Sequence, residues 1–257
     1  MTEEMRPPKD DLVRAQPGDF ELRGQPDGTS MPTMVGHFAV FDQWTEIHSM
    51  FEGHFLERLM PGAFKQSIRQ LEANPASVRV TFQHGQDPQL GDKVLGPIEV
   101  LEEDERGARY EVPLLDTSYN RDLVPGLQAG LYGSSFRFQV TKEDFQRHPE
   151  RSATNPEQLP ERTIREVRLH EFGPVTYPAY AGATAGVRSL TDHFTLARFL
   201  QEPDRLAELL EAMRNGAALA TAGAADKPHS EEASSPATPA PPTFRSREEW
   251  LTFIKEK

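Results

Sequence analysis

The run GLYGSSFRFQV, residues 130–140, joins a glycine-rich turn to a segment in which polar and apolar side chains alternate. Such alternation predicts a β-strand whose successive side chains point to opposite faces. Ser134 then shares a face with the bulky Phe136, whereas Ser135 shares the other face with Arg137. A serine on a face without aromatic rings is the better candidate for a nucleophile. Two serines that merely follow a glycine turn are nevertheless the commoner case.

An upstream run, VRVTFQHG at residues 78–85, predicts a second strand that ends in an imidazole. Alternation puts His84 on the same face as Val80 and Phe82, where little water is expected. The pattern alone leaves two interpretations equally open. His84 is either a core histidine bonded to a backbone carbonyl or a general base beside a nucleophile.

A downstream run, RLHEFGPV at residues 168–175, predicts a third strand that carries a carboxylate. Glu171 falls on the face of Val167 and Leu169, where a carboxylate is costly unless it accepts hydrogen bonds or meets a cation. Alternation therefore selects Glu171 over Glu166 as the buried acid, with a structural ion pair to an arginine as the alternative. A hydroxyl, an imidazole and a carboxylate together are the parts needed for nucleophilic acyl transfer.

Composition limits the class of protein. The 257 residues are enough for one sizeable core, but 22 prolines and a hydrophobic content of 37% indicate that part of the chain lies outside it. The absence of cysteine excludes disulfides and a cysteine nucleophile. A net charge of −12 without a basic stripe makes nucleic acid an unexpected partner. With no signal peptide and no apolar run of roughly 20 residues, we expect a cytoplasmic protein without membrane contact.

The histidines form no H-E-x-x-H or comparable metal-binding pattern. A zinc site built from His48, His54 and a carboxylate is a weak alternative, and it would make the protein a metal-dependent hydrolase. We expect neither a metal ion nor another cofactor.

The predicted elements favour an α+β fold around an antiparallel sheet or a small β-barrel with surrounding helices. One helix is expected to open at residues 61–64 and to end at 74–75, and a shorter one at 118–129 is expected to be interrupted at Pro125. Strands are expected at 34–41, 94–101, 108–115, 132–140 and 163–175, and polar loops at 42–57 and 141–163.

Changes in composition divide the chain into parts. These are a disordered N-terminal segment at 1–30, a compact domain at 31–190, a helical extension at 191–216, a flexible Ala/Ser/Pro-rich linker at 217–243 and a short amphipathic helix at 244–257. A strand that starts near residues 20–22 is the alternative for part of the N-terminal segment. A small amphipathic helix on a flexible tether often acts as a docking peptide.

Several of these runs resemble the signature blocks of the tailed-bacteriophage prohead maturation proteases. The three main ones are VTFQHG at 80–85, GLYGSSFRF at 130–138 and LHEFGPVTYPA at 169–179, and PGAF at 61–64 resembles a fourth. The resemblance covers roughly residues 34–190 in the family's block order. It implies a fold similar to that of the herpesvirus capsid protease, assemblin.

The resemblance also implies roles for individual residues. The serine block, in the family's register, falls on Ser135 as nucleophile, with His84 as general base and Glu171 as the group that orients the imidazole. The FGP run at 172–174 departs from the small residue and serine that usually follow the acid. Because assemblin uses a second histidine as its third member, His170 stays a candidate for that role.

The function implied is a serine endopeptidase of head assembly. Its substrates would be the scaffolding segment of the major capsid protein and the protease itself, and self-association and the portal are further candidate contacts. The protein would act in the host cytoplasm inside the assembling prohead, and its C-terminal tail would dock it there and be removed by autolysis. Arg137 or backbone N–H groups near Gly133 would stabilise the oxyanion. A catalytically inactive scaffold that retains the protease fold is the alternative.

Overall fold

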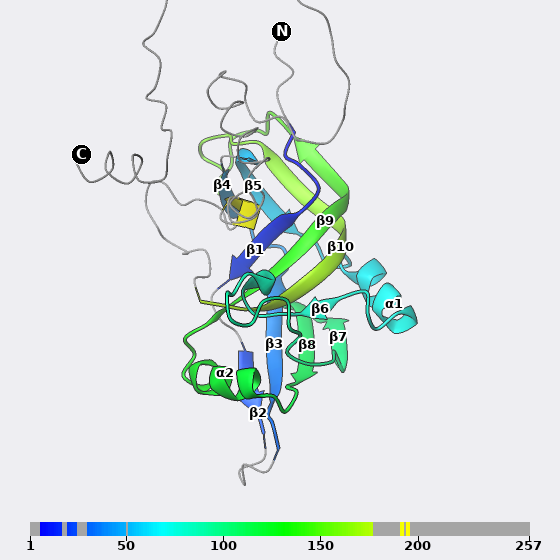
Figure 1. Cartoon of the computed structure of the whole chain (residues 1–257). Helices are drawn as coiled ribbons and strands as arrows, with labels where there is room; N and C mark the ends of the chain where they lie inside the picture. Colours follow the sequence, from blue (N-terminus) through cyan, green and yellow to red (C-terminus); the bar gives the residue numbers. More distant parts are fainter. Residues whose placement is uncertain are drawn as a thin grey trace, which may run out of the picture. The chain divides into compact units, whose positions relative to one another are not determined.

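The computed structural model describes residues 6–16, 20–24, 30–49, 51–176, 191–192 and 194–195 (Figure 1). This part of the chain forms two β-sheets and two α-helices. The predicted linker at 217–243, the C-terminal helix at 244–257 and most of the helical extension lie outside the described residues. The predicted domain boundaries therefore stay predictions.

The first sheet is built from β1 (Leu12–Gln16), β4 (Thr45–Ser49), β5 (Gly53–Leu59), β6 (Arg79–Val80), β9 (Gly133–Gln146) and β10 (Glu161–Val175). Its order is β1-β9-β10-β5-β4, and β6 also pairs with β10. The long antiparallel hairpin of β9 and β10 forms its centre. The sequence predicted an antiparallel sheet. This sheet is mixed instead, because β5 and β6 run parallel to β10.

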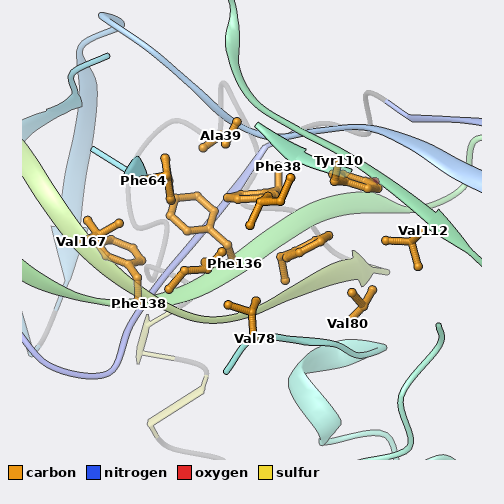
Figure 2. Close-up of a cluster of buried hydrophobic side chains, with 14 of the residues drawn as sticks. Phe38, Ala39, Phe64, Val78, Val80, Tyr110, Val112, Phe136, Phe138 and Val167 are labelled. Carbon is orange, nitrogen blue, oxygen red and sulfur yellow. The ribbon is translucent and has the colours of Figure 1, made fainter. Parts of the chain in front are cut away.

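The second sheet is antiparallel, with strands β2 (Phe20–Arg23), β3 (Thr33–Val40), β7 (Val100–Glu103) and β8 (Gly107–Pro113) in the order β2-β3-β8-β7. Aromatic side chains join it to the first sheet in a single core, as Figure 2 shows. The ring centroid of Phe38 on β3 lies 4.7 Å from that of Phe172 on β10 and 5.3 Å from that of Phe136 on β9. The apolar face of the hairpin therefore buries itself against the second sheet.

The α+β prediction is confirmed in its coarse form, since both sheets are accompanied by α1 (Lys65–Ala73) and α2 (Ser118–Gln128). Both sheets are open along their described strands, so the predicted small barrel is not what forms. The likeness to the herpesvirus protease stays a prediction. Helix α1 ends at Asn74 as predicted. The predicted interruption at Pro125 is wrong: helix α2 runs through it, and Leu123 and Leu127 on either side are buried in the core.

The prediction that residues 1–30 are disordered is wrong for β1, whereas the alternative of a strand start near residues 20–22 is confirmed by β2. Strand β1 pairs antiparallel with β9, and its Leu12 and Val13 are buried. Strand β2 pairs with β3, and its Leu22 packs against the core. Each strand has only four or five residues, which is too short for its periodicity to stand out among the surrounding proline and acidic residues.

One predicted loop is wrong, and a second is wrong at both ends. Thr45–Ser49 and Gly53–Leu59 form the β4–β5 hairpin in place of the loop predicted at 42–57, whereas 141–146 and 161–163 belong to β9 and β10 and the middle of that loop, 147–160, connects the two strands. Charge suggested a solvated loop, but on a hairpin the charges pair across strands. Lys142 lies 2.7 Å from Glu166, and Arg165 lies 2.8 Å from Asp144.

No helix in the described part of the chain is long and apolar enough to cross a membrane.

Candidate active site

Ser135 lies near the start of β9, where that strand is flanked on both sides. Its partners in the sheet are Gly173 on β10 and Ala15 on β1. Ser134 is buried on the opposite face, as alternation predicted, and its hydroxyl has no hydrogen-bond partner. Of the two serines, only Ser135 has a hydroxyl that hydrogen-bonds to a histidine.

The alternation predicted that His84 ends a strand, and this prediction is wrong. Strand β6 stops at Val80, and residues Gln83–Gly85 form a 3₁₀ turn in which His84 has φ 57° and ψ 28°. Left-handed backbone is unfavourable for a non-glycine residue and recurs at functional sites. Gln83 shares this conformation with φ 52°. The double left-handed turn redirects the chain, so the imidazole direction cannot be read from a two-residue period.

Glu171 is buried on β10, as predicted from its face, and a register irregularity separates it from Leu169. A bulge of this kind re-aims the following side chain. Beyond it, Gly173 allows the chain of Thr81 to approach, because a Cβ at Gly173 would lie 1.9 Å from the Thr81 carbonyl oxygen. The glycine in the FGP run therefore has a steric role at the junction of β10 with the histidine-bearing segment.

The three predicted groups meet in one hydrogen-bonded chain. Ser135 Oγ lies 2.8 Å from His84 Nε2, and His84 Nδ1 lies 2.5 Å from Glu171 Oε1. The second carboxylate oxygen, Oε2, accepts a 2.9 Å hydrogen bond from the hydroxyl of Thr81. Ser135 is 0% exposed, and the side chains of His84 and Glu171 are 7% and 6% exposed. This is the geometry of a nucleophile, a base and an orienting acid in a water-poor site.

Sequence reasoning missed Thr81. Its hydroxyl fixes the carboxylate from the side away from the imidazole. The only feature of the sequence that could have drawn attention to Thr81 is its position three residues before His84, within the VTFQHG run.

His170, the alternative third member, is half-buried, and the two ring nitrogens of His84 bond to Ser135 and Glu171 instead. Burial lowers the pKa of His170, and the charge of Arg137 lowers it further. Glu171, not His170, occupies the position next to Nδ1 of His84.

Arg137 contacts the acid side of the site. Its Nη1 lies 3.2 Å from Asp11 Oδ1, and its Nε lies 3.8 Å from Glu171 Oε1. The guanidinium also lies over the ring of Phe194, 5.4 Å from the centroid. The guanidinium of Arg137 therefore points toward the carboxylates of Asp11 and Glu171. The proposed role of Arg137 in stabilising the oxyanion stays a prediction.

The histidines of the alternative zinc site face one another across the β4–β5 hairpin. The rings of His48 and His54 are 4.8 Å apart, and His54 Nε2 lies 2.7 Å from Glu46 Oε1. Across the described residues, however, no three His, Asp or Glu side chains gather in a way that could hold a metal ion.

Comparisons with known proteins agree with the resemblance seen in the sequence. The model of the caudovirus prohead serine protease family matches residues 19–196. Among solved structures, the bacteriophage T4 capsid assembly protease is similar at 11% identity, with a TM-score of 0.40 over 66% of this chain and 98% of that chain. No curated protein sequence matches this chain significantly. Because the family model spans well over half of the sequence, this chain belongs to the caudovirus prohead serine protease family.

Proposed function

We propose that this protein is an active serine endopeptidase of prohead maturation, with Ser135 as nucleophile, His84 as general base and Glu171 as the acid that orients the imidazole. The observation that carries the proposal is the unbroken chain of hydrogen bonds from Ser135 Oγ through both ring nitrogens of His84 to Glu171 Oε1. Membership of the prohead protease family supports it independently.

The reaction begins when Ser135 Oγ attacks the scissile carbonyl carbon while Nε2 of His84 accepts the hydroxyl proton. The carboxylate of Glu171 stabilises the imidazolium that forms and keeps the Nδ1 proton in place. His84 then passes its proton to the leaving amine, and an acyl-enzyme ester remains on Ser135. Water, deprotonated by the same imidazole, hydrolyses the ester and restores the enzyme.

The substrates proposed are the scaffolding segment of the major capsid protein and the protease itself, with cleavage inside the assembling prohead in the host cytoplasm. The helical extension, the linker and the C-terminal helix would dock the enzyme there, and autolysis would remove them. Self-association and contact with the portal belong to the same proposal, as does a common fold with the herpesvirus protease.

Co-expression with the major capsid precursor tests the nucleophile. Ser135→Ala is expected to abolish trimming of the precursor, because the hydroxyl that attacks the carbonyl is gone. Ser134→Ala is the matched control, since this neighbouring serine points to the opposite face and is expected to leave trimming intact. Intact-mass spectrometry of both partners reports the cleavage. Normal trimming by Ser135→Ala would refute the assignment.

The inactive-scaffold alternative draws on one observation, the complete burial of Ser135. A serine-directed phosphonate separates the two functions. An active protease is expected to be labelled at Ser135, whereas an inert scaffold would not be labelled there.

A further inference from the structure

The candidate active site is closed in this structure. Ser135 is 0% exposed, and the side chains of His84 and Glu171 are 7% and 6% exposed. A substrate peptide therefore needs part of the chain to move before it can reach the hydroxyl. The segment in contact with the nucleophile is the N-terminal strand β1, which lies beside β9 (Figure 1).

Strand β1 lies where a substrate strand would lie. It forms the edge of the first sheet, antiparallel to β9, with Ala15 opposite Ser135. Peptides are commonly recognised by adding a strand to a sheet edge in this manner. Moreover, the Ser135 hydroxyl donates a 2.9 Å hydrogen bond to the carbonyl oxygen of Arg14. The peptide bond after Arg14 is thus the one presented to the nucleophile.

The Arg14 carbonyl oxygen competes with His84 for the serine hydrogen. A hydroxyl has one hydrogen to donate, and Ser135 Oγ faces two acceptors, the Arg14 carbonyl oxygen at 2.9 Å and His84 Nε2 at 2.8 Å. While the hydrogen is given to Arg14, the imidazole cannot remove it. Departure of β1 leaves His84 as the partner of the hydroxyl, which is the arrangement that general-base catalysis requires.

The side chain of Arg14 fills a buried acidic pocket. Its guanidinium lies 2.6 Å from Glu52 Oε2 and 2.7 Å from Glu57 Oε1, and these two carboxylate side chains are 0% and 5% exposed. Burial alone would raise the pKa of Glu52, but the charge and hydrogen bonds of Arg14 outweigh it and lower that pKa. Arg162 shares Glu57 with Arg14 and is itself engaged by Glu143. When Arg14 leaves, Glu52, Glu57 and Glu143 still outnumber Arg162 and Lys9, so the pocket favours a positively charged replacement.

The outer edge of β1 is held by a small polar clamp. The hydroxyl of Thr191 accepts a hydrogen bond from the backbone N–H of Val13 at 2.9 Å and donates one to the Val13 carbonyl oxygen at 3.1 Å. The match to the family model begins at residue 19, after β1 has ended. Strand β1 lies outside the matched residues and is tied down at the edge beside the nucleophile.

We propose that β1 is a built-in inhibitor that occupies the substrate's place, and that the Glu52–Glu57 pocket selects substrates with arginine or lysine immediately before the scissile bond. The proposal rests on the proposed protease function and adds its regulation and specificity. Leu12, two residues before Arg14, is buried in the core and adds a preference for an aliphatic side chain at that position. In a substrate, Ser135 Oγ bonds to the carbonyl carbon of the basic residue, and the amine of the next residue leaves with a proton from His84.

The inhibition is tested by the rate at which a fluorophosphonate labels Ser135 in the full-length protein. Arg14→Gln removes the charge that holds β1 and is expected to speed labelling at least tenfold, whereas Arg14→Lys keeps the charge and stays near the wild-type rate. Thr191→Val opens the clamp and is expected to speed labelling by a different route. Arg165→Gln, which breaks an exposed ion pair on β10, is the matched control and stays at the wild-type rate.

The same variant tests whether β1 acts as a ligand. A synthetic peptide that copies residues 9–18, added to Arg14→Gln, is expected to slow labelling again, and a version with glutamate at the arginine position is expected to have no effect. Circular dichroism confirms that each variant is folded. Equal labelling rates in wild type, Arg14→Gln and Thr191→Val would overturn the inhibitory role.

Specificity is tested with quenched fluorescent peptides that differ only in the residue before the scissile bond. Arginine and lysine are expected to give a kcat/KM at least tenfold above glutamine. Glu52→Gln removes one carboxylate of the pocket and is expected to reduce that preference, whereas the control Arg165→Gln is expected to keep it. Equal cleavage of the glutamine or glutamate peptide would overturn the selectivity.

Failure of this inference can be told from failure of the proposed function. Rapid labelling in every variant, with normal trimming of capsid precursor, would overturn the inhibitory strand and leave the protease intact. Absence of both labelling and trimming in every folded variant would overturn the protease and the inference together.

Discussion

Glu171→Gln isolates the contribution of one negative charge to the proposed reaction. The carboxylate binds His84 Nδ1 at 2.5 Å and the Thr81 hydroxyl at 2.9 Å. Glutamine has nearly the same shape, and its carbonyl oxygen can still accept the Nδ1 proton. The Thr81 hydroxyl can rotate to accept from the new amide, so the hydrogen-bonded geometry can survive without the charge.

The expected loss follows from the attraction between carboxylate and imidazolium. With charge centres roughly 4 Å apart and an effective dielectric constant of about 20, this attraction is about 4 kcal/mol. The charge appears on His84 only as the proton moves, so the loss falls on the transition state. A barrier higher by about 4 kcal/mol lowers kcat by roughly 10³.

The assay compares kcat for a capsid-precursor peptide in wild type, Glu171→Gln and Glu171→Gln/Thr81→Val. The double variant removes the hydroxyl that can adapt to the amide, so the amide is free to turn its NH₂ group toward Nδ1. That orientation would place the imidazole proton on Nε2, facing Ser135, and lower kcat further. A kcat for Glu171→Gln within fivefold of wild type would refute the reasoning, provided thermal unfolding shows that the variant is folded.

Three further predictions concern stability. Arg14 holds the pKa of Glu52 below its ordinary value of 4.5. The ion pair therefore stabilises the fold above that pH and loses its effect as the pH falls through the lowered pKa. The free energy of unfolding of wild type, measured with denaturant, should exceed that of Glu52→Gln at neutral pH, and the difference should shrink at acidic pH. Asn155→Ala should cost about 1–3 kcal/mol in the same assay, since the buried amide ties together the 147–160 connection. Gly173→Ala should lower the melting temperature and the rate of peptide cleavage, because a Cβ there would lie 1.9 Å from the Thr81 carbonyl oxygen and force β6 away from β10; unchanged values would contradict the steric role.

Much of the first sheet's centre was predictable because its periodicity is local. The alternation at 132–140 predicted β9 and distinguished Ser135 from Ser134, and the alternation before Glu171 predicted a buried acid. The two ends of the charged stretch at 141–163 were misread as loop, since cross-strand ion pairs and solvated loops have the same composition. The sequence pattern could not decide whether His84 is a core histidine or a general base. The direction of its side chain depends on a left-handed turn, which a two-residue alternation does not predict.

The sequence by itself determined which side chains share a face, which serine is free of aromatic neighbours and which acid is buried, because these properties depend on residues a few positions apart. Only the tertiary structure decided that Ser135, His84 and Glu171 meet, since the contacts join residues 51 and 87 positions apart. It also decided that β1 covers the nucleophile and that Arg14 enters a pocket made by Glu52 and Glu57. Local periodicity shows which face of a strand is buried, but it does not show which distant strand will pair with it, because that pairing depends on contacts between segments far apart in the sequence.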